Sequence, residues 1–218
     1  MKVLGEIMFE IKGLKFKQIL DIPELTIEKQ ITCIVGASGS GKTTLLRMLN
    51  RLNAPDVGMI RYNGTDLSKI DAVKLRRSVI MLGQTPILYG GAIRDNLQIG
   101  LEFSQRPPAP DEALKESLER VSLSKGLDDS CGTLSGGEKQ RLCLARVMLM
   151  DADTYLLDEP SSALDQETEH FIIQNLAQFV IALHKQLIMV THSEQIASDY
   201  PDSLIRLENG RIAGVFHE

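Results

Sequence analysis

The chain has 218 residues, 43% of them hydrophobic, which suits one large domain, or one domain with a small subdomain, around a real core. Its formal net charge of −5 comes without a basic block, so we expect no nucleic-acid partner. The longest apolar runs, such as residues 179–183, are far shorter than the ~20 residues that cross a bilayer. If this protein works at a membrane, another chain must supply the spanning part. We also expect no secretory signal, because Met1–Glu6 lacks a long apolar segment.

The three cysteines, Cys33, Cys131 and Cys143, are odd in number and lack the spacing of metal ligands. Cys33 lies in a predicted strand and Cys143 in a predicted apolar helix. We therefore expect these two thiols to be reduced core residues of a cytosolic protein.

The first part of the chain is predicted to be β-rich and to lead into a glycine-rich loop. Residues 9–12 and 25–28 alternate apolar and polar side chains, and residues 31–35 indicate a buried parallel strand. The loop sequence that follows, GASGSGKTT, precedes a helix that we expect to continue to about Leu52. The loop fits the pattern G-x-x-x-x-G-K-[ST], the P-loop or Walker A motif, in its required strand–loop–helix context.

The P-loop chemistry follows from its glycines and its position. Glycines let backbone N–H groups turn inward at a helix N-terminus, and both features favour bound phosphate; the alternative is an ordinary Gly/Ser-rich loop. We expect Lys42 to reach the β- and γ-phosphates of a nucleotide and the Thr43 hydroxyl to ligate Mg²⁺. The residues expected to bind nucleotide are Gly36, Ala37, Ser38, Gly39, Ser40, Gly41, Lys42, Thr43 and Thr44.

The middle of the chain changes from mixed structure to helices. The pattern first predicts a strand at 58–62, a turn at 63–64, a helix at 71–77 and a buried strand at 78–82. From Gln84 to Leu134 strands disappear, and helices are expected at 92–98 and at 111–121, the latter with a solvated charged face. We interpret this stretch as a small inserted helical subdomain. A further helix is expected at 137–150. The helical part then covers about residues 84–150 of a single domain that spans residues 1–218.

The last part alternates strands and helices, which favours a largely parallel sheet. The expected elements are a strand at 154–157, a helix at 166–183, a strand at 187–190 and a hairpin of 203–207 with 211–216 around Asn209-Gly210. The predicted fold class is α/β: a P-loop NTPase core with a mostly parallel sheet, an antiparallel β subdomain and a small inserted helical subdomain. A nucleotide would lie at the carboxyl ends of the parallel strands.

Acidic residues at a strand end complement the P-loop. The apolar residues 155–157 end in Asp158, the Walker B arrangement, and we expect this carboxylate to hold Mg²⁺ through water. Glu159 follows at once and could orient or deprotonate the attacking water. The alternative is a polar loop that begins after a strand.

A second anion-binding surface is predicted at Ser135-Gly136-Gly137, where a hydroxyl, backbone N–H groups and a helix N-terminus come together. One chain needs only one P-loop for one ATP, so this surface suggests that a partner's ATP binds here. The structural alternative is a glycine-permitted turn capped by Ser135.

These motifs, in this order, resemble the ATP-binding cassette (ABC) ATPases over essentially the whole chain. The matching positions are Gly36–Thr43 for Walker A, Gln84 for the Q-loop, Leu134–Gly137 for the signature motif, Asp158 and Glu159 for Walker B and the catalytic glutamate, Ser162–Asp165 for the D-loop, and His192 for the switch histidine. A random chain would not assemble these six motifs.

The resemblance implies a mechanism. Two nucleotide-binding domains would pair head-to-tail, with each ATP between Walker A of one domain and the signature residues of the other; ATP would close the dimer and hydrolysis would release it. Glu159 would polarise the water and His192 would contact the γ-phosphate. Gln84 would sense Mg²⁺ or water and link to the partner subunit, and Asp165 would line the dimer interface.

The leading hypothesis is the ATPase subunit of a transporter whose integral membrane permease is a separate chain, with two copies forming a homodimer. Such a subunit is cytoplasmic and peripheral on the inner face of the cell membrane. Residues 84–97 look like the region that docks the coupling helix of a permease. Their form is similar to short bacterial Fet-type ATPases assigned to iron or metal export, and importers of phosphate or amino acids are the alternative.

Two other classes of P-loop protein are alternatives to the transporter subunit. Non-transport ABC ATPases that act on DNA or ribosomes usually carry a long coiled coil or two cassettes, and this sequence shows one P-loop, one signature and no sustained heptads. A P-loop kinase or switch protein outside the ABC family would not need the signature motif.

The sequence departs from the family pattern at the adenine site, and this difference gives a testable prediction. Many ABC ATPases stack adenine on an aromatic residue shortly after the position of Phe16, where this chain has Lys17-Gln18. Phe16 is the nearest aromatic residue and is either a stacking residue or part of the core. If it stacks, Phe16→Ala weakens ATP binding by about 5- to 150-fold, which corresponds to a loss of about 1–3 kcal/mol of stacking. An unchanged nucleotide affinity, measured by calorimetry on a folded variant, would exclude stacking.

Overall fold

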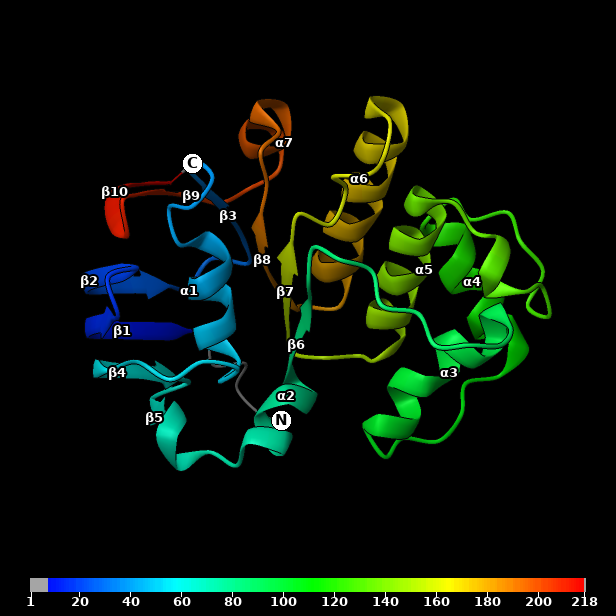
Figure 1. Ribbon diagram of the computed structural model, residues 1–218, viewed down its shortest axis with the longest axis horizontal. Helices are drawn as coiled ribbons and strands as arrows, with labels where there is room; N and C mark the ends of the chain where they lie inside the picture. The colour runs from blue at the N-terminus through cyan, green and yellow to red at the C-terminus, as the bar shows by residue number, and fades with distance from the viewer. Residues whose placement is uncertain (1–7, 218) are drawn as a thin grey trace.

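The computed structural model describes residues 8–217 (Figure 1). The expectation about a secretory signal at Met1–Glu6 therefore lies outside the described residues. Strands in this part of the chain form two sheets. In the described region, no helix combines the length and apolar character needed to cross a membrane.

The central sheet has six strands in the order β10-β9-β3-β8-β7-β6. Five of its strands run parallel and β10 pairs antiparallel with β9. The bounds are β3 (Ile31–Val35), β6 (Val79–Leu82), β7 (Thr154–Asp158), β8 (Gln186–Val190), β9 (Ser203–Glu208) and β10 (Arg211–His217). Every residue of β7 and β8 is buried, as expected of parallel strands covered on both faces.

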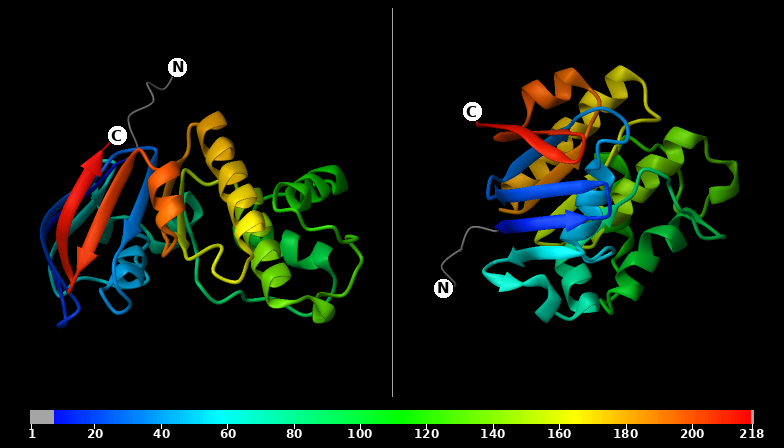
Figure 2. Two further views of the ribbon diagram at one scale, coloured as in Figure 1. Left: turned by 90° about the horizontal axis from the view of Figure 1, so that it is seen from above. Right: turned by 60° about the vertical axis from the view of Figure 1, so that its left-hand side comes forward.

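A smaller antiparallel sheet lies beside the central one, with the order β2-β1-β4-β5 (Figures 1 and 2). Its strands are β1 (Phe9–Phe16), β2 (Leu20–Ile27), β4 (Val57–Tyr62) and the two-residue β5 (Thr65–Asp66). The predicted strand at 25–28 is thus only the end of β2. Pro23 interrupts the sequence pattern, but β2 is an edge strand, where a residue without an N–H is tolerated.

Seven α-helices are described in residues 8–217. They are α1 (Lys42–Leu49), α2 (Ala72–Ser78), α3 (Ile93–Phe103), α4 (Asp111–Arg120), α5 (Gly136–Leu149), α6 (Gln166–Ala182) and α7 (Glu194–Asp199), with 3-10 turns at Leu67–Lys69 and Cys131–Thr133. Helices α3 and α4 lie together beyond the β6 edge of the sheet and pack on α5 (Figure 1). The predicted fold class, including the inserted helical part, is confirmed.

Two helix ends differ from the prediction, one for a local reason and one for a tertiary reason. Helix α1 ends at Leu49 rather than about Leu52, because Arg51 adopts a left-handed conformation, with φ 57°, which terminates the helix. Helix α3 continues to Phe103 rather than ending at residue 98. Gly100 lets α3 approach α5 closely, since a Cβ there would lie 2.9 Å from the Met150 sulfur. Neither α7 nor β5 was predicted.

The described buried side chains form two clusters, one on each face of the central sheet. The cluster around Leu45, Leu46 and Leu49 joins α1 to the antiparallel sheet. The cluster around Leu142, Ile172 and Tyr155 joins the sheet to α5, α6 and the inserted helices. All three cysteines are buried and free, so the predictions for Cys33 and Cys143 as reduced core residues agree with their surroundings.

Two Asn-Gly turns have the left-handed residues of a type I′ hairpin, with φ 50° and 76° at Asn63-Gly64 and 46° and 78° at Asn209-Gly210. The second turn is tied to the P-loop, because Gly210 N–H donates to the Ser40 carbonyl at 3.1 Å. The Gly210 carbonyl accepts from Asp21 N–H at 2.8 Å. This turn therefore holds the P-loop against the β1–β2 hairpin.

Gly210→Ala is expected to destabilise the fold more than Gly64→Ala does. Both alanines would occupy the left-handed region, at a cost of about 1 kcal/mol. At position 210 the added Cβ would also lie 2.1 Å from the Ile19 carbonyl oxygen, whereas at position 64 nothing lies within 4 Å. The total cost at Gly210 is then about 3 kcal/mol. Urea unfolding of the two variants measures the difference, and equal midpoints would contradict it.

Candidate functional site

The P-loop connects β3 to α1 and encloses the end of one lysine side chain. Lys42 is 6% exposed, and its Nζ donates to the carbonyl oxygens of Gly36 at 2.8 Å and Ala37 at 2.9 Å. The loop takes this shape because Gly41, just before the helix, has φ 104°. It is also tightly packed, since a Cβ on Gly36 would lie 2.1 Å from the Leu207 carbonyl oxygen.

Asp158 ends β7 directly beside the first turn of α1. Thr43 Oγ1 donates to Asp158 Oδ1 at 3.1 Å. Burial raises the pKa of Asp158 above its ordinary value, and the nearby Glu159 raises it further, while the Thr43 hydrogen bond opposes both. A hydroxyl next to a carboxylate is the hard oxygen donor set that Mg²⁺ prefers. A bound cation would also relieve the cost of burying this charge, so the residues present fit Mg²⁺.

Glu159 lies between two side chains from neighbouring strand ends. Gln84 Nε2 donates to Glu159 Oε2 at 2.8 Å, and His192 Nε2 lies 2.9 Å from Glu159 Oε1. Gln84 follows β6, Glu159 follows β7 and His192 follows β8, and these strands are adjacent in the sheet. Within residues 8–217, Gln84 thus forms its side-chain hydrogen bond with Glu159 and none with Thr43 or Asp158.

The predicted signature residues begin α5 and cap it. Ser135 Oγ accepts from Glu138 N–H at 3.3 Å, and Glu138 Oε2 accepts from Ser135 N–H at 2.8 Å, a reciprocal capping box. The backbone hydrogen bond from Ser135 lowers the pKa of Glu138 to about 2. The capped turn is therefore present. Ser135 and Gly136 are nevertheless exposed, and within residues 8–217 no hydrogen bond joins them to the P-loop.

Asp165, the predicted D-loop aspartate, caps α6. Its carboxylate accepts from Thr168 N–H at 3.0 Å and from Thr168 Oγ1 at 2.8 Å, and these hydrogen bonds lower its pKa. Phe16, the residue considered for adenine stacking, is half-buried against the core, with Lys17 Nζ 5.0 Å from its ring centroid.

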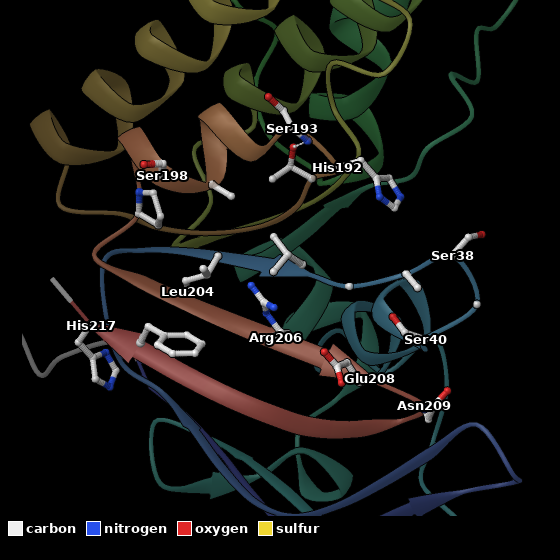
Figure 3. Close-up of a pocket in the computed structure, with 18 residues that line it drawn as sticks. Ser38, Ser40, His192, Ser193, Ser198, Leu204, Arg206, Glu208, Asn209 and His217 are labelled. Carbon is white, nitrogen blue, oxygen red and sulfur yellow. Dashed lines mark hydrogen bonds between the residues drawn. The ribbon is translucent and has the colours of Figure 1, made fainter.

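A cavity of about 940 Å³ opens on the side of the P-loop that faces α7 and the β9–β10 hairpin (Figure 3). Ser38 and Ser40 come to it from the P-loop, His192 from the end of β8, and Arg206 from β9. The predicted phosphate loop and the predicted switch histidine thus share one hollow.

Sequence reasoning missed one residue that touches this site. Gln140 of α5 is 3% exposed, and its Nε2 donates to the Glu159 carbonyl oxygen at 2.8 Å. The available signal was helical spacing, because Gln140 lies three and four residues before the apolar Cys143 and Leu144 and so shares the buried face of α5.

Comparisons with known proteins agree with this geometry. The family model described as "ABC transporter" matches residues 21–162. The methionine import ATP-binding protein MetN 2 of Paraburkholderia xenovorans is 32% identical, over 96% of this chain and 55% of the relative. The phosphate import ATP-binding protein PstB 2 of Bacillus licheniformis is 34% identical, over 94% of this chain and 80% of the relative.

The chain thus spans about half the length of the MetN relative and four fifths of the PstB relative. Among solved structures, a bacterial Atm1-family ABC exporter with ATP bound matches with a TM-score of 0.87 and 26% identity. The match covers 99% of this chain and 39% of the exporter chain. The chain therefore belongs to the ABC transporter family, as an ATP-binding domain of that family of ATPases.

Proposed function

We propose that this chain is the ATP-binding and ATP-hydrolysing subunit of an ABC transporter that powers transport through a separate membrane permease by ATP-driven dimerisation. The observation that carries the proposal is the contact of Glu159 with both Gln84 and His192 at one edge of the sheet. Residues 1–218 would act as one nucleotide-binding domain, with residues 84–150 as its helical part.

The P-loop would bind the phosphates of ATP through the backbone of residues 36–44. Lys42 Nζ, now held by two loop carbonyls, would turn to the β- and γ-phosphates. Thr43, Asp158 and Gln84 would hold Mg²⁺, which when bound neutralises charge on the phosphate oxygens.

Glu159 would act as the general base. Both of its carboxylate oxygens have partners, so a water must displace one of them before it can be deprotonated. As the water oxygen bonds to the γ-phosphorus, the bond from that phosphorus to the bridging oxygen breaks and a water proton passes to Glu159. His192, freed from Glu159, would contact the γ-phosphate. The products are ADP and phosphate.

Exposed surfaces of the single chain support the proposal of a dimer. Ser135 and Gly136 are exposed at the start of α5, where a helix N-terminus favours an anion. A second nucleotide-binding domain would present its ATP there. In a homodimer the same two surfaces are used twice around a two-fold axis, and Asp165 would line the interface.

Exposed apolar side chains beside the loop that follows Gln84 support the proposal of a permease partner. Leu52, Ile87, Tyr89 and Phe103 are exposed and line a cavity of about 420 Å³. An exposed apolar patch of this kind marks a protein interaction site. A permease docked here would hold the subunit on the cytoplasmic, inner face of the membrane.

The transported substrate has two candidates. The resemblance to Fet-type ATPases favours iron or metal export. The names of the curated relatives describe methionine and phosphate import, which favours a small-solute importer instead. A role on DNA or ribosomes is the non-transport alternative.

Glu159→Gln is expected to trap an ATP-bound dimer, because ATP still binds while the base is lost. Light scattering after size exclusion with Mg-ATP measures the mass, and ATPase rates should fall at least about 100-fold. Lys42→Ala, which removes the phosphate-binding ammonium, should abolish hydrolysis and stay monomeric. A monomeric Glu159→Gln protein at high concentration would argue against the ATP sandwich, and a retained rate in Lys42→Ala against the P-loop assignment.

Tagged Glu159→Gln, purified with Mg-ATP from detergent-solubilised cells, should bring with it a polytopic membrane protein that mass spectrometry identifies. Adding Phe103→Ser should release that protein, whereas adding Phe171→Ser, an exposed phenylalanine on α6, should not. Recovery of ribosomal or DNA-repair proteins alone would favour the non-transport alternative.

A further inference from the structure

Gln140 connects the helix of the signature residues to the loop that carries Glu159. Its Nε2 donates to the Glu159 carbonyl oxygen at 2.8 Å and lies 3.4 Å from Ser162 Oγ. Its Oε1 accepts from Ala163 N–H at 3.0 Å. Both ends of one buried amide are therefore used, and both bind the segment between β7 and α6.

The Glu159 backbone needs such support, because it has φ 51° and lies in the left-handed region that a residue with a Cβ rarely adopts. Its N–H donates to the Val190 carbonyl at 3.0 Å, from β8. Its carbonyl accepts from Gln140, from α5. These two hydrogen bonds from opposite sides set the direction of the Glu159 side chain.

The packing around Gln140 leaves the loop little freedom. A Cβ on Gly137, in the first turn of α5, would lie 3.0 Å from the Ala163 carbonyl oxygen and 3.2 Å from Leu164. Helix α5 therefore touches the same segment at its start and, one turn later, at Gln140. A change at Gln140 would therefore shift the Glu159 backbone just after the end of β7.

We propose that Gln140 is a positioning residue for ATP hydrolysis: its amide holds the Glu159 backbone so that the carboxylate reaches the attacking water. This inference rests on the proposed role of Glu159 as the base. In the described part of the chain, the side-chain hydrogen bonds of Gln140 go to the segment after β7 and none goes to Lys42, Thr43 or Asp158, so Gln140 acts on the rate of hydrolysis and not on ATP binding.

Gln140→Met tests the proposal, since methionine keeps the length of the side chain and loses the amide. We expect kcat to fall about 100-fold, the loss that a misplacement of about 1 Å can cause. The KM and the calorimetric Kd for Mg-ATP should stay within about threefold of wild type. Gln174→Met, the same change on an exposed position of α6, is the matched control and should leave kcat unchanged.

A double variant separates positioning from a general structural effect. In a Glu159→Gln background, Gln140→Met should cause no further loss of single-turnover rate, because the base it positions is already absent. If Gln140→Met does not fold, as judged by circular dichroism, Gln140→Glu takes its place, since it keeps the acceptor for Ala163 and loses the donor to Glu159. The same loss of kcat is expected.

The outcomes for Gln140 and for Glu159 are distinguishable. A folded Gln140 variant with a kcat within threefold of wild type overturns the positioning role, and so does an equal further loss in the Glu159→Gln background. If Glu159→Gln itself retains the wild-type kcat, the proposed base is wrong and the role of Gln140 fails with it. If Glu159→Gln is inactive while Gln140→Met is fully active, only the role of Gln140 fails.

Discussion

The parallel pairing of β6, β7 and β8 is the constraint on which the candidate site depends. Leu82 pairs with Leu157, and Asp158 pairs with Val190, so the three strands reach the same edge of the sheet together. The residues just beyond them, Gln84, Glu159 and His192, come from positions far apart in the chain and meet within hydrogen-bond distance. A slip of one residue in either pairing would turn these side chains to the wrong face.

The carboxyl ends of these strands bring together groups that lower the free energy of unfolding. Lys42 and Asp158 are charged residues with little exposure, and burial raises the pKa of the Asp158 carboxyl. Glu159 adds the conformational cost of a left-handed backbone. The apolar clusters on the two faces of the central sheet offset these costs. Buried charges of this kind are groups that a bound nucleotide and cation would satisfy, and strained or perturbed groups are commonly found at functional sites.

Several side chains serve the fold of one chain and remain available to a second. Ser135 caps α5 and Asp165 caps α6, and both positions are exposed. The alternatives of a structural cap and a ligand surface are therefore compatible, since a cap uses one hydroxyl or carboxylate and leaves the neighbouring backbone N–H groups at the surface. The buried Gln140 of α5 contacts the loop that joins β7 to α6.

The sequence by itself determined the elements whose signals are local. Apolar runs indicated β3, β7 and β8, the Asn-Gly pairs indicated two turns, and the glycines and Lys42 of the P-loop predicted a phosphate-binding loop. Only the tertiary structure decided the start of β2, because Pro23 is tolerated through the edge position of that strand, and the length of α3, because Gly100 packs against Met150. It also decided that Glu159 contacts Gln84 and His192 and that Gln140 supports it. Contacts between residues 19 to 75 positions apart depend on strand order and register, which no local pattern encodes.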